Sequence, residues 1–349
     1  MLIKDMARRL QITPRAIRYY EEKGLIRPAK AGDSGYRQFT EEDVWRLQTI
    51  MTLREVGMSI DDIRELLAQM KEHEGTLLHY LELQRSFMYT RWVEMAKVIQ
   101  TTEAMIERIG NSQTIDPGEL FELAEANKRL RQTRDNWVDR WNFNQMADSY
   151  DEWVQRESQS TNAHQAYERV LDEVVAALGP VKGESGLDAG TGTGNLASRL
   201  VRQGASMSGF DQSPQMLKRC RSKLPGMETK LGTFFAFPFL EDRFDFVATS
   251  YALHLLDDDQ KLLALAECRR VLKPGGRLAI ADLMFVDEAA RQAHLAALAR
   301  DGKNEAIAQI EDRFYADRSR LLRELAALGF AAEARQLTTY THMIVARLK

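Results

Sequence analysis

The run LDAGTGTGN at 187–195 limits the fold of this chain more than any other stretch. A strand pattern leads into it, three glycines alternate with other residues inside it, and a helix pattern begins at Leu196. Because glycine has no Cβ, such a turn lets a ligand approach the backbone and the free amides that open the helix. The next strand pattern ends at Asp211, 21 residues beyond Gly190, where a carboxylate can accept hydrogen bonds from both ribose hydroxyls. This predicts a Rossmann-like α/β domain, a feature that a nicotinamide enzyme would share.

The chain around this run alternates between helix and strand patterns, which is typical of such a domain. We expect a helix near Ala163–Leu178, strands at Phe244–Ser250 and Arg277–Asp282, and a helix at Asp258–Leu272 between those strands. The segment KPGG at 273–276 predicts the turn into the later strand. A strand pair ending in YTHMIVARL predicts a closing antiparallel strand.

Length and composition set further bounds. The chain has 349 residues, 44% of them apolar and 28% charged, which favours two globular domains with connecting structure. No apolar run reaches the ~20 residues that cross a bilayer, and MLIKDMARRL lacks the apolar core of a signal peptide, so we expect a cytoplasmic protein without membrane contact. Cys220 and Cys268 are expected to be reduced thiols, and no metal site is predicted.

The first 39 residues are basic, with nine Lys and Arg against four Asp and Glu, whereas the other residues carry a net charge of −8. This end of the chain therefore suits a polyanion. Helical spacing over Lys4–Leu10 is followed by Thr13-Pro14, an N-cap with proline in the first helical position, and Gly24 ends the second helix. Two short helices joined by a tight turn predict a helix-turn-helix.

The second helix can place its N-terminal side chains against base edges and phosphates in a major groove. The turn-rich segment Leu25–Phe39 predicts a β-hairpin wing beside it. Capped helices are expected at 40–53 and 59–70. The expected DNA-binding residues are Arg15, Arg18 and Tyr19 on the helix, and Tyr36 and Arg37 on the wing.

Three segments, ITPRAIRYYEEKGLIRP, GYRQFTEEDVWRLQTI and LREVGMSIDDIRELL, closely resemble the DNA-binding domain of MerR-family regulators over about 70 residues. The resemblance implies a homodimer that binds near-palindromic, double-stranded promoter DNA and distorts it between two promoter elements, so that RNA polymerase is affected indirectly. Metal-sensing members of that family place cysteines around the following helix. Because this chain has none there, metal sensing is disfavoured.

A stretch from Gly75 to Ile109 contains no other glycine and no proline, which predicts one long helix. Its apolar residues follow alternating steps of three and four, the spacing of a coiled-coil seam. In the resembled family this position holds the antiparallel dimerisation helix; packing on the chain's own C-terminal domain is the alternative. The expected dimerisation residues are Leu81, Met88, Trp92, Met95, Ile99 and Ile106.

The segments LDAGTGTG, GFDQSPQML, FDFVATSYALHLL and RRVLKPGGRLAIAD together look like a class I S-adenosylmethionine-dependent methyltransferase over about residues 137–349. The likeness is closest to a small methyltransferase family of bacilli without an established substrate, and it includes the lead-in WNFNQMADSYDEWV. It implies a seven-stranded, mostly parallel sheet. We therefore expect a multidomain chain with an all-α winged helix-turn-helix at 1–72, a coiled-coil helix at 73–110, a linker helix at 111–135 and a methyltransferase-like domain at 136–349.

By this resemblance the cofactor is S-adenosyl-L-methionine. It would contact the glycine turn, the carboxylate after the second strand and the segment after the third. The position that matches the family's usual adenine-facing Asp is Thr233 here, a departure that bears on affinity. The expected cofactor-binding residues are Asp188, Gly190, Gly192, Gly194, Asp211, Thr233 and Phe234.

Methyl transfer from a sulfonium needs mainly an aligned nucleophile and a water-poor pocket, so a dedicated base is not required. Tyr251 and His254 follow the strand Phe244–Ser250 and are candidates to orient or deprotonate a substrate, with packing as the alternative. An aromatic-rich lead-in, which includes Phe143, can cover an apolar or cationic ligand or pack in the core. The expected effector-pocket residues are Trp137, Trp141, Tyr150 and Trp153.

Two functions agree with these features. In the favoured one, the C-terminal domain binds S-adenosylmethionine or a small-molecule effector and modulates promoter distortion. In the alternative, it is an active small-molecule methyltransferase with an autoregulatory DNA-binding domain. Methylation of DNA itself is disfavoured, because the Asn/Asp-Pro-Pro-Tyr/Phe motif of amino-methylating DNA enzymes is replaced here by Ser250-Tyr251-Ala252-Leu253.

Overall fold

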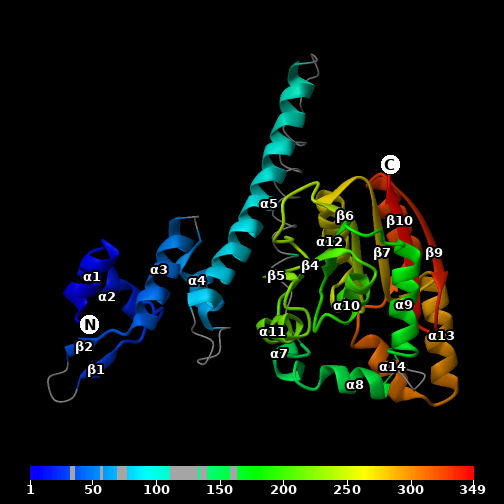
Figure 1. The fold of residues 1–349 in the computed structure, drawn as a ribbon, viewed down its shortest axis with the longest axis horizontal. Helices are drawn as coiled ribbons and strands as arrows, with labels where there is room; N and C mark the ends of the chain where they lie inside the picture. Colours follow the sequence, from blue (N-terminus) through cyan, green and yellow to red (C-terminus); the bar gives the residue numbers. More distant parts are fainter. Residues whose placement is uncertain (32–35, 56–57, 69–76, 111–132, 134–139, 158–162) are drawn as a thin grey trace. The chain divides into compact units, whose positions relative to one another are not determined.

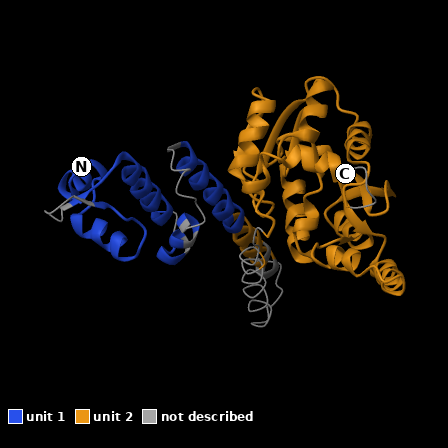
Figure 2. Ribbon diagram, turned by 90° about the horizontal axis from the view of Figure 1, so that it is seen from below, with its two compact units in different colours: residues 1–95 blue, residues 96–349 orange. Residues whose placement is uncertain are grey.

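A computed structural model describes residues 1–31, 36–55, 58–68, 77–110, 133, 140–157 and 163–349 of the chain (Figure 1). The chain forms two compact units, residues 1–95 and residues 96–349 (Figure 2). The division falls inside the long helix α5 (Leu77–Gly110). Across the described residues we find no helix with the length and apolar character needed to span a membrane.

Short capped helices and one two-stranded ladder make up the first unit. The Thr13 hydroxyl accepts the amide of Ala16 at 3.1 Å and Pro14 follows it, so the second helix begins where the sequence predicts. Gly24, with φ of +73°, follows the end of that helix. The elements are α1 (Ile3–Leu10), α2 (Pro14–Glu22), β1 (Ala29–Ala31), β2 (Tyr36–Gln38), α3 (Glu41–Glu55) and α4 (Ile60–Ala68), with β1 and β2 antiparallel.

One apolar core holds this unit together. Ile17 of α2, Leu47 and Ile50 of α3, and Ile63 of α4 are fully buried in it. Tyr80, near the start of α5, is buried in the same core, which fixes the first turns of α5 to the small helices. Arg9 of α1 also makes two hydrogen bonds to the carboxylate of Glu41, at 2.5 and 2.8 Å.

Helix α5 carries an apolar stripe that the described chain leaves uncovered. The six residues predicted for the dimer seam are each between 37% and 63% exposed: Leu81, Met88, Trp92, Met95, Ile99 and Ile106. Isolated exposed apolar residues are common, but a stripe of this length on one helix is unusual for a surface that meets only water.

The second unit is built on one mixed sheet in the order β5-β4-β3-β6-β7-β10-β9. Neighbours from β5 to β7 are parallel, and β10 is antiparallel to both β7 and β9. The strands are β3 (Ser185–Ala189), β4 (Ser206–Asp211), β5 (Glu228–Leu231), β6 (Phe244–Ser250), β7 (Leu272–Phe285), β8 (Ala316–Asp317), β9 (Phe330–Gln336) and β10 (Thr341–Leu348).

The prediction of seven strands is corrected to eight among the described residues, because the two-residue strand β8 pairs with the end of β7. Strand β7 extends beyond both ends of the predicted Arg277–Asp282, so Met284 and Phe285 offer backbone groups to Ala316 and Asp317. The predicted turn at 273–276 is instead a register shift between β6 and β7, with φ of +76° at Gly275.

Helices cover both faces of this sheet (Figure 1). Residues of α9 (Tyr167–Leu178), α10 (Asn195–Arg202), α13 (Glu288–Arg300) and α14 (Asn304–Glu311) join one hydrophobic cluster. Residues of α12 (Asp258–Val271) and α15 (Arg318–Ala327) join another. These two apolar layers hold the carboxyl ends of β3, β4 and β6 in fixed positions. The other described helices after α5 are α7 (Phe143–Met146), α8 (Tyr150–Glu157), α11 (Pro214–Lys223) and η2 (Leu253–Leu255).

Candidate functional site

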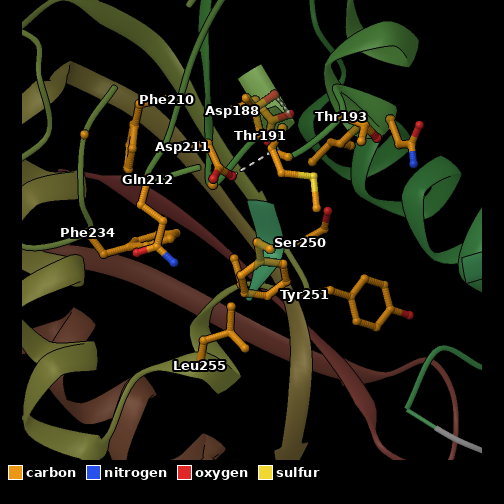
Figure 3. A pocket seen from close by; sticks show the side chains of 18 of the residues that line it. Asp188, Thr191, Thr193, Phe210, Asp211, Gln212, Phe234, Ser250, Tyr251 and Leu255 are labelled. Atoms are coloured by element: carbon orange, nitrogen blue, oxygen red, sulfur yellow. Dashed lines mark hydrogen bonds between the residues drawn. The ribbon is translucent and has the colours of Figure 1, made fainter. Parts of the chain in front are cut away.

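A pocket, partly open to solvent, lies where the parallel strands end (Figure 3). Its walls are set by the order of the strands, because the loops that leave β3, β4 and β6 meet at one edge of the sheet. They comprise the glycine loop 190–193, Asp211-Gln212, residues 232–235, residues 250–252 with Leu255 and Leu256, and the side chains of Phe143 and Tyr150.

The glycine loop owes its shape to two positions. Gly190 has φ of +72°, and a Cβ there would lie 2.9 Å from Cβ of Ala252 and 3.0 Å from the ring of Phe234. Gly194 has φ of +85°, and its Cβ would lie 2.9 Å from Sγ of Cys220. Gly190 therefore keeps space at the pocket, whereas Gly194, which is not among the lining residues, allows packing behind it.

Asp188 holds the glycine loop in place. Its Oδ2 accepts hydrogen bonds from Thr191 Oγ1 at 2.8 Å and from the amide of Ala197 at 3.1 Å. It thereby caps α10, whose own N-cap residue Gly194 has no side chain to do so. Burial raises the pKa of Asp188 to about 7. The residue lines the pocket as predicted, but both of its hydrogen bonds are to the chain itself.

Asp211 lies at the end of β4, beside the glycine loop. Its Oδ2 accepts the amide of Gly192 at 2.9 Å, and its Oδ1 accepts the amide of Ser213 at 2.8 Å. A carboxylate has about four acceptor positions. The geometry therefore leaves Asp211 able to accept from a ligand while it fixes the loop on either side.

Aromatic rings form another wall. Phe210 and Phe234 meet edge to face with centroids 5.4 Å apart, and both lie to one side of Asp211 in Figure 3. Next to Phe234, the Thr233 hydroxyl accepts the amide of Phe235 at 3.3 Å, so its proton can still be donated to a ligand. This wall suits a flat heteroaromatic ring.

Acidic but not basic side chains line the pocket among the described residues. Asp188 and Asp211 are the acidic residues that line it, and no Lys, Arg or His is found among the described lining residues. Such a site favours a cationic ligand over one with a pyrophosphate group, which proteins usually hold with cationic side chains or many backbone amides.

The two catalytic candidates lie in different places. Tyr251 lines the pocket, with φ of +51°, and its hydroxyl lies 3.3 Å from Thr341 Oγ1. Burial raises its pKa, so it remains a neutral phenol at neutral pH. His254 does not line the pocket, because its Nδ1 lies 2.8 Å from Oδ1 of the buried Asp282. A catalytic role for His254 stays a prediction, and this geometry does not bring it to the ligand.

The aromatic residues of the lead-in also lie in different places, some in the pocket and some outside it. Tyr150 and Phe143 line the pocket. Trp153 instead packs on His164, with ring centroids 4.9 Å apart, and Trp141 lies beside Phe143, with ring centroids 6.4 Å apart. Trp137 lies outside the described residues. Sequence reasoning missed several lining residues that helices or loops carry, namely Tyr167, Thr193, Asn195, Gln212, Met216 and Leu255.

Helices α7 and α8 form a strap over residues 143–157 that is fastened beside the pocket. Oδ1 of Asp151 accepts hydrogen bonds from Thr193 Oγ1 at 2.6 Å and from Asn195 Nδ2 at 2.9 Å. Its Oδ2 accepts one from Lys223 Nζ at 2.8 Å. Burial opposes ionisation of Asp151, but these three donors outweigh it and hold its pKa below the ordinary value. The strap is thus bonded to the glycine loop itself.

In the first unit, Arg15, Arg18 and Tyr19 are exposed on α2, while Ile17 of the same helix is buried. Residues three and four apart lie on one helix face, so these three side chains form one exposed surface. The side chain of Tyr36 lies outside the described residues. Arg37 Nε donates to Glu21 Oε2 at 2.6 Å, which ties strand β2 to α2.

Neither the thiols nor a carboxylate cluster indicates a metal. Cys220 and Cys268 are both free and buried. Within the part of the chain that the structure describes, no group of three or more His, Cys, Asp or Glu side chains is placed to hold a metal ion.

Comparisons with known proteins match different family models to the N-terminal and the C-terminal part of the chain. Residues 1–70 match the family model described as MerR HTH family regulatory protein, and residues 187–276 match the one described as methyltransferase domain. An uncharacterised methyltransferase of Geobacillus kaustophilus is 34% identical over 207 residues, which are 58% of this chain and 94% of that protein. One of Alkaliphilus oremlandii is 29% identical over 205 residues, 58% of this chain and 94% of its own.

Among solved structures, an S-adenosylmethionine-dependent methyltransferase of Mesorhizobium loti is similar over 50% of this chain and 96% of its own, at 20% identity and a TM-score of 0.40. The fold and the two family matches define a multidomain chain with a MerR helix-turn-helix domain and an α/β methyltransferase domain. The chain belongs to the same methyltransferase family as the Geobacillus kaustophilus protein.

Proposed function

We propose that this chain is a dimeric transcription regulator whose methyltransferase domain binds S-adenosyl-L-methionine, alone or with a small-molecule effector, and thereby changes how the DNA-binding end distorts a promoter. Helix α2 would read a major groove, the hairpin β1–β2 would serve as the wing, and α5 would pair with α5 of a second copy in an antiparallel coiled coil. RNA polymerase would respond to the distorted promoter rather than to the protein surface.

The pocket carries the cofactor part of this proposal. Its residues fit S-adenosylmethionine, since Asp211 can accept from ribose hydroxyls, Phe210 and Phe234 can face the adenine, and a pocket lined by acidic and not by basic side chains favours a sulfonium cation. The lack of a cationic side chain among the described lining residues weighs against a nicotinamide dinucleotide. When bound, S-adenosylmethionine supplies an electrophilic methyl group. The chain would hold it, orient it and exclude water with Tyr150, Phe234 and Leu255.

The alternative function is an active small-molecule methyltransferase with an autoregulatory DNA-binding domain. The family membership favours it, because the relatives are named methyltransferases. In that case Tyr251, which lines the pocket beside Ser250, would position the acceptor.

Calorimetry with S-adenosylmethionine tests the cofactor assignment, and Asp211→Ala is the variant that tests its site. We expect the wild type to bind with one site per chain and the variant to lose at least about 100-fold in affinity, because hydrogen bonds to a charged acceptor contribute about 1.5–3 kcal/mol each. Asp301→Ala, which removes an exposed carboxylate near Lys303, is the control and should bind like the wild type. Equal affinity of Asp211→Ala and wild type would contradict the assignment. Release of S-adenosylhomocysteine, abolished in Asp211→Ala, would favour the enzyme over the sensor.

A second prediction concerns α2. Arg18→Ala should weaken binding to a selected promoter duplex by about 1–3 kcal/mol and relax sequence preference at one base pair, since Arg18 is exposed on the proposed reading face. Arg18→Lys keeps the positive charge but cannot donate two parallel hydrogen bonds to one base. Compared with Arg18→Ala, it should therefore recover more of the nonspecific DNA affinity than of the sequence preference. Fluorescence anisotropy across a salt series measures both. A loss that is uniform over all sequences, with a shallower salt slope, would assign Arg18 to a phosphate instead.

A further inference from the structure

One wall of the pocket continues directly into a helix start. Leu255 and Leu256 line the pocket, and Asp257 follows as the N-cap of α12. Oδ1 of Asp257 accepts the amide of Gln260 at 2.8 Å, while Oε1 of Gln260 accepts the amide of Asp257 at 2.9 Å. This reciprocal pair is a capping box, and it fixes the end of the wall to α12.

The other end of the Gln260 amide reaches a distant part of the chain. Its Nε2 donates to the carbonyl oxygen of Thr133 at 3.0 Å, across 127 positions of sequence. The Gln260 side chain is buried, at 3% exposure, whereas Thr133 is half-buried, so this hydrogen bond is partly shielded from water. In the sequence, Thr133 stands between α5 and the strap.

The strap supplies a second connection to the same stretch of chain. It begins ten residues after Thr133, contributes Phe143 and Tyr150 to the pocket, and is bonded to the glycine loop through Asp151. The two walls are therefore bonded to Thr133 and to the strap, which both belong, in the sequence, to the stretch that joins α5 to the rest of the methyltransferase domain.

We propose that Gln260 is a positioning residue that transmits occupancy of the pocket to this joining segment, and through it to DNA binding. The inference rests on the proposed function, since it needs a cofactor in the pocket and a duplex at α2. A ligand that favours one position of the 255–257 wall shifts the position of Thr133 with it, because the buried amide holds both ends at once. By linkage, DNA must then change the affinity for the cofactor by the same factor.

Gln260→Glu separates this connection from the fold. Ionised glutamate still accepts the amide of Asp257 and keeps the capping box, but it has no proton to donate to the Thr133 carbonyl. Because burial favours a protonated carboxyl, which can donate its O–H, Gln260→Met is the second variant needed for the test. The experiment measures the affinity of the full-length chain for a duplex selected in vitro on the wild type, with and without saturating S-adenosylmethionine. For the wild type we expect a ratio between about 5-fold and 150-fold, the usual range for coupled sites. For Gln260→Glu we expect a ratio within twofold of one, with each separate affinity within about threefold of wild type.

Gln203→Glu makes the same chemical change at an exposed position after α10 and should keep the wild-type ratio. Gln260→Met, which keeps the length of the side chain without its amide, should behave like Gln260→Glu. A wild-type ratio preserved in both Gln260 variants would overturn the role of Gln260 and leave the proposed function standing. A wild type that binds both ligands with a ratio of one would overturn the regulatory proposal as well. In the wild type alone, S-adenosylmethionine should change hydrogen exchange in the peptide that contains Thr133, and unchanged exchange there would overturn the connection.

Discussion

Gly190→Ala is expected to lower the affinity for S-adenosylmethionine by about 5-fold to 150-fold while the domain stays folded. The new methyl group would lie 2.9–3.0 Å from Ala252 and Phe234, closer than carbon atoms pack, so one of these walls must move into the space that the cofactor needs. Overpacking of this kind costs about 1–3 kcal/mol, and the affinity falls tenfold for every 1.4 kcal/mol. Calorimetry measures the affinity, and thermal melting measures the stability.

Gly302→Ala separates backbone strain from filling of the pocket. Gly302 has φ of +71°, almost the same as the +72° of Gly190, but a Cβ there meets no atom within 4 Å. Both variants should lose stability to the left-handed backbone, by roughly 1–2 kcal/mol, yet Gly302→Ala should bind the cofactor like the wild type. If both variants bound it equally well, the pocket at the glycine loop would not be the cofactor site.

Ile99→Lys is expected to raise the dissociation constant of the dimer by more than 100-fold. Ile99 is 50% exposed on the apolar stripe of α5, and in a twofold-symmetric dimer the substitution occurs twice. Burying the exposed half of one isoleucine contributes about 0.8–1.5 kcal/mol, or about 1.5–3 kcal/mol for the two copies. Each lysine ammonium that takes its place adds a desolvation cost, so the total loss is about 3 kcal/mol or more. Sedimentation over a range of concentrations measures the shift from dimer to monomer.

Gln100→Lys adds the same charge one position further along the helix, outside the stripe, and should leave the dimer intact. Because a helix turns by about 100° per residue, the two variants test which face of α5 is covered. A dimer that survives Ile99→Lys and dissociates with Gln100→Lys would place the contact on another face.

The features that sequence reasoning located best have a local cause. The N-cap at Thr13, the proline after it and the glycine at 24 are read within a few residues, so the bounds of α2 follow from neighbouring side chains. The strand, glycine turn and helix around Gly190, and the carboxylate of Asp211 at the end of the next strand, are likewise predicted from short stretches of sequence. Both residues line the pocket.

The features it did not foresee depend on contacts that only the folded chain creates, some of them between residues far apart in the sequence. Asp188 was expected to bind the cofactor, yet its two hydrogen bonds are to Thr191 and Ala197, since a helix that opens on glycines needs an acceptor from elsewhere. Strand β8 forms because β7 extends past its predicted end. The contact of His254 with Asp282 spans 28 positions, and no local pattern indicates it.

The hydrogen bond between Arg37 and Glu21 has a consequence for how this protein can change its target. It joins β2 to α2, so the spacing of these two elements is set partly by a contact inside the protein. If α2 and β2 contact DNA as proposed, a substitution at Glu21 would change that spacing without changing Arg15, Arg18 or Tyr19. A change of operator could then arise from this internal contact, with the proposed reading residues left as they are.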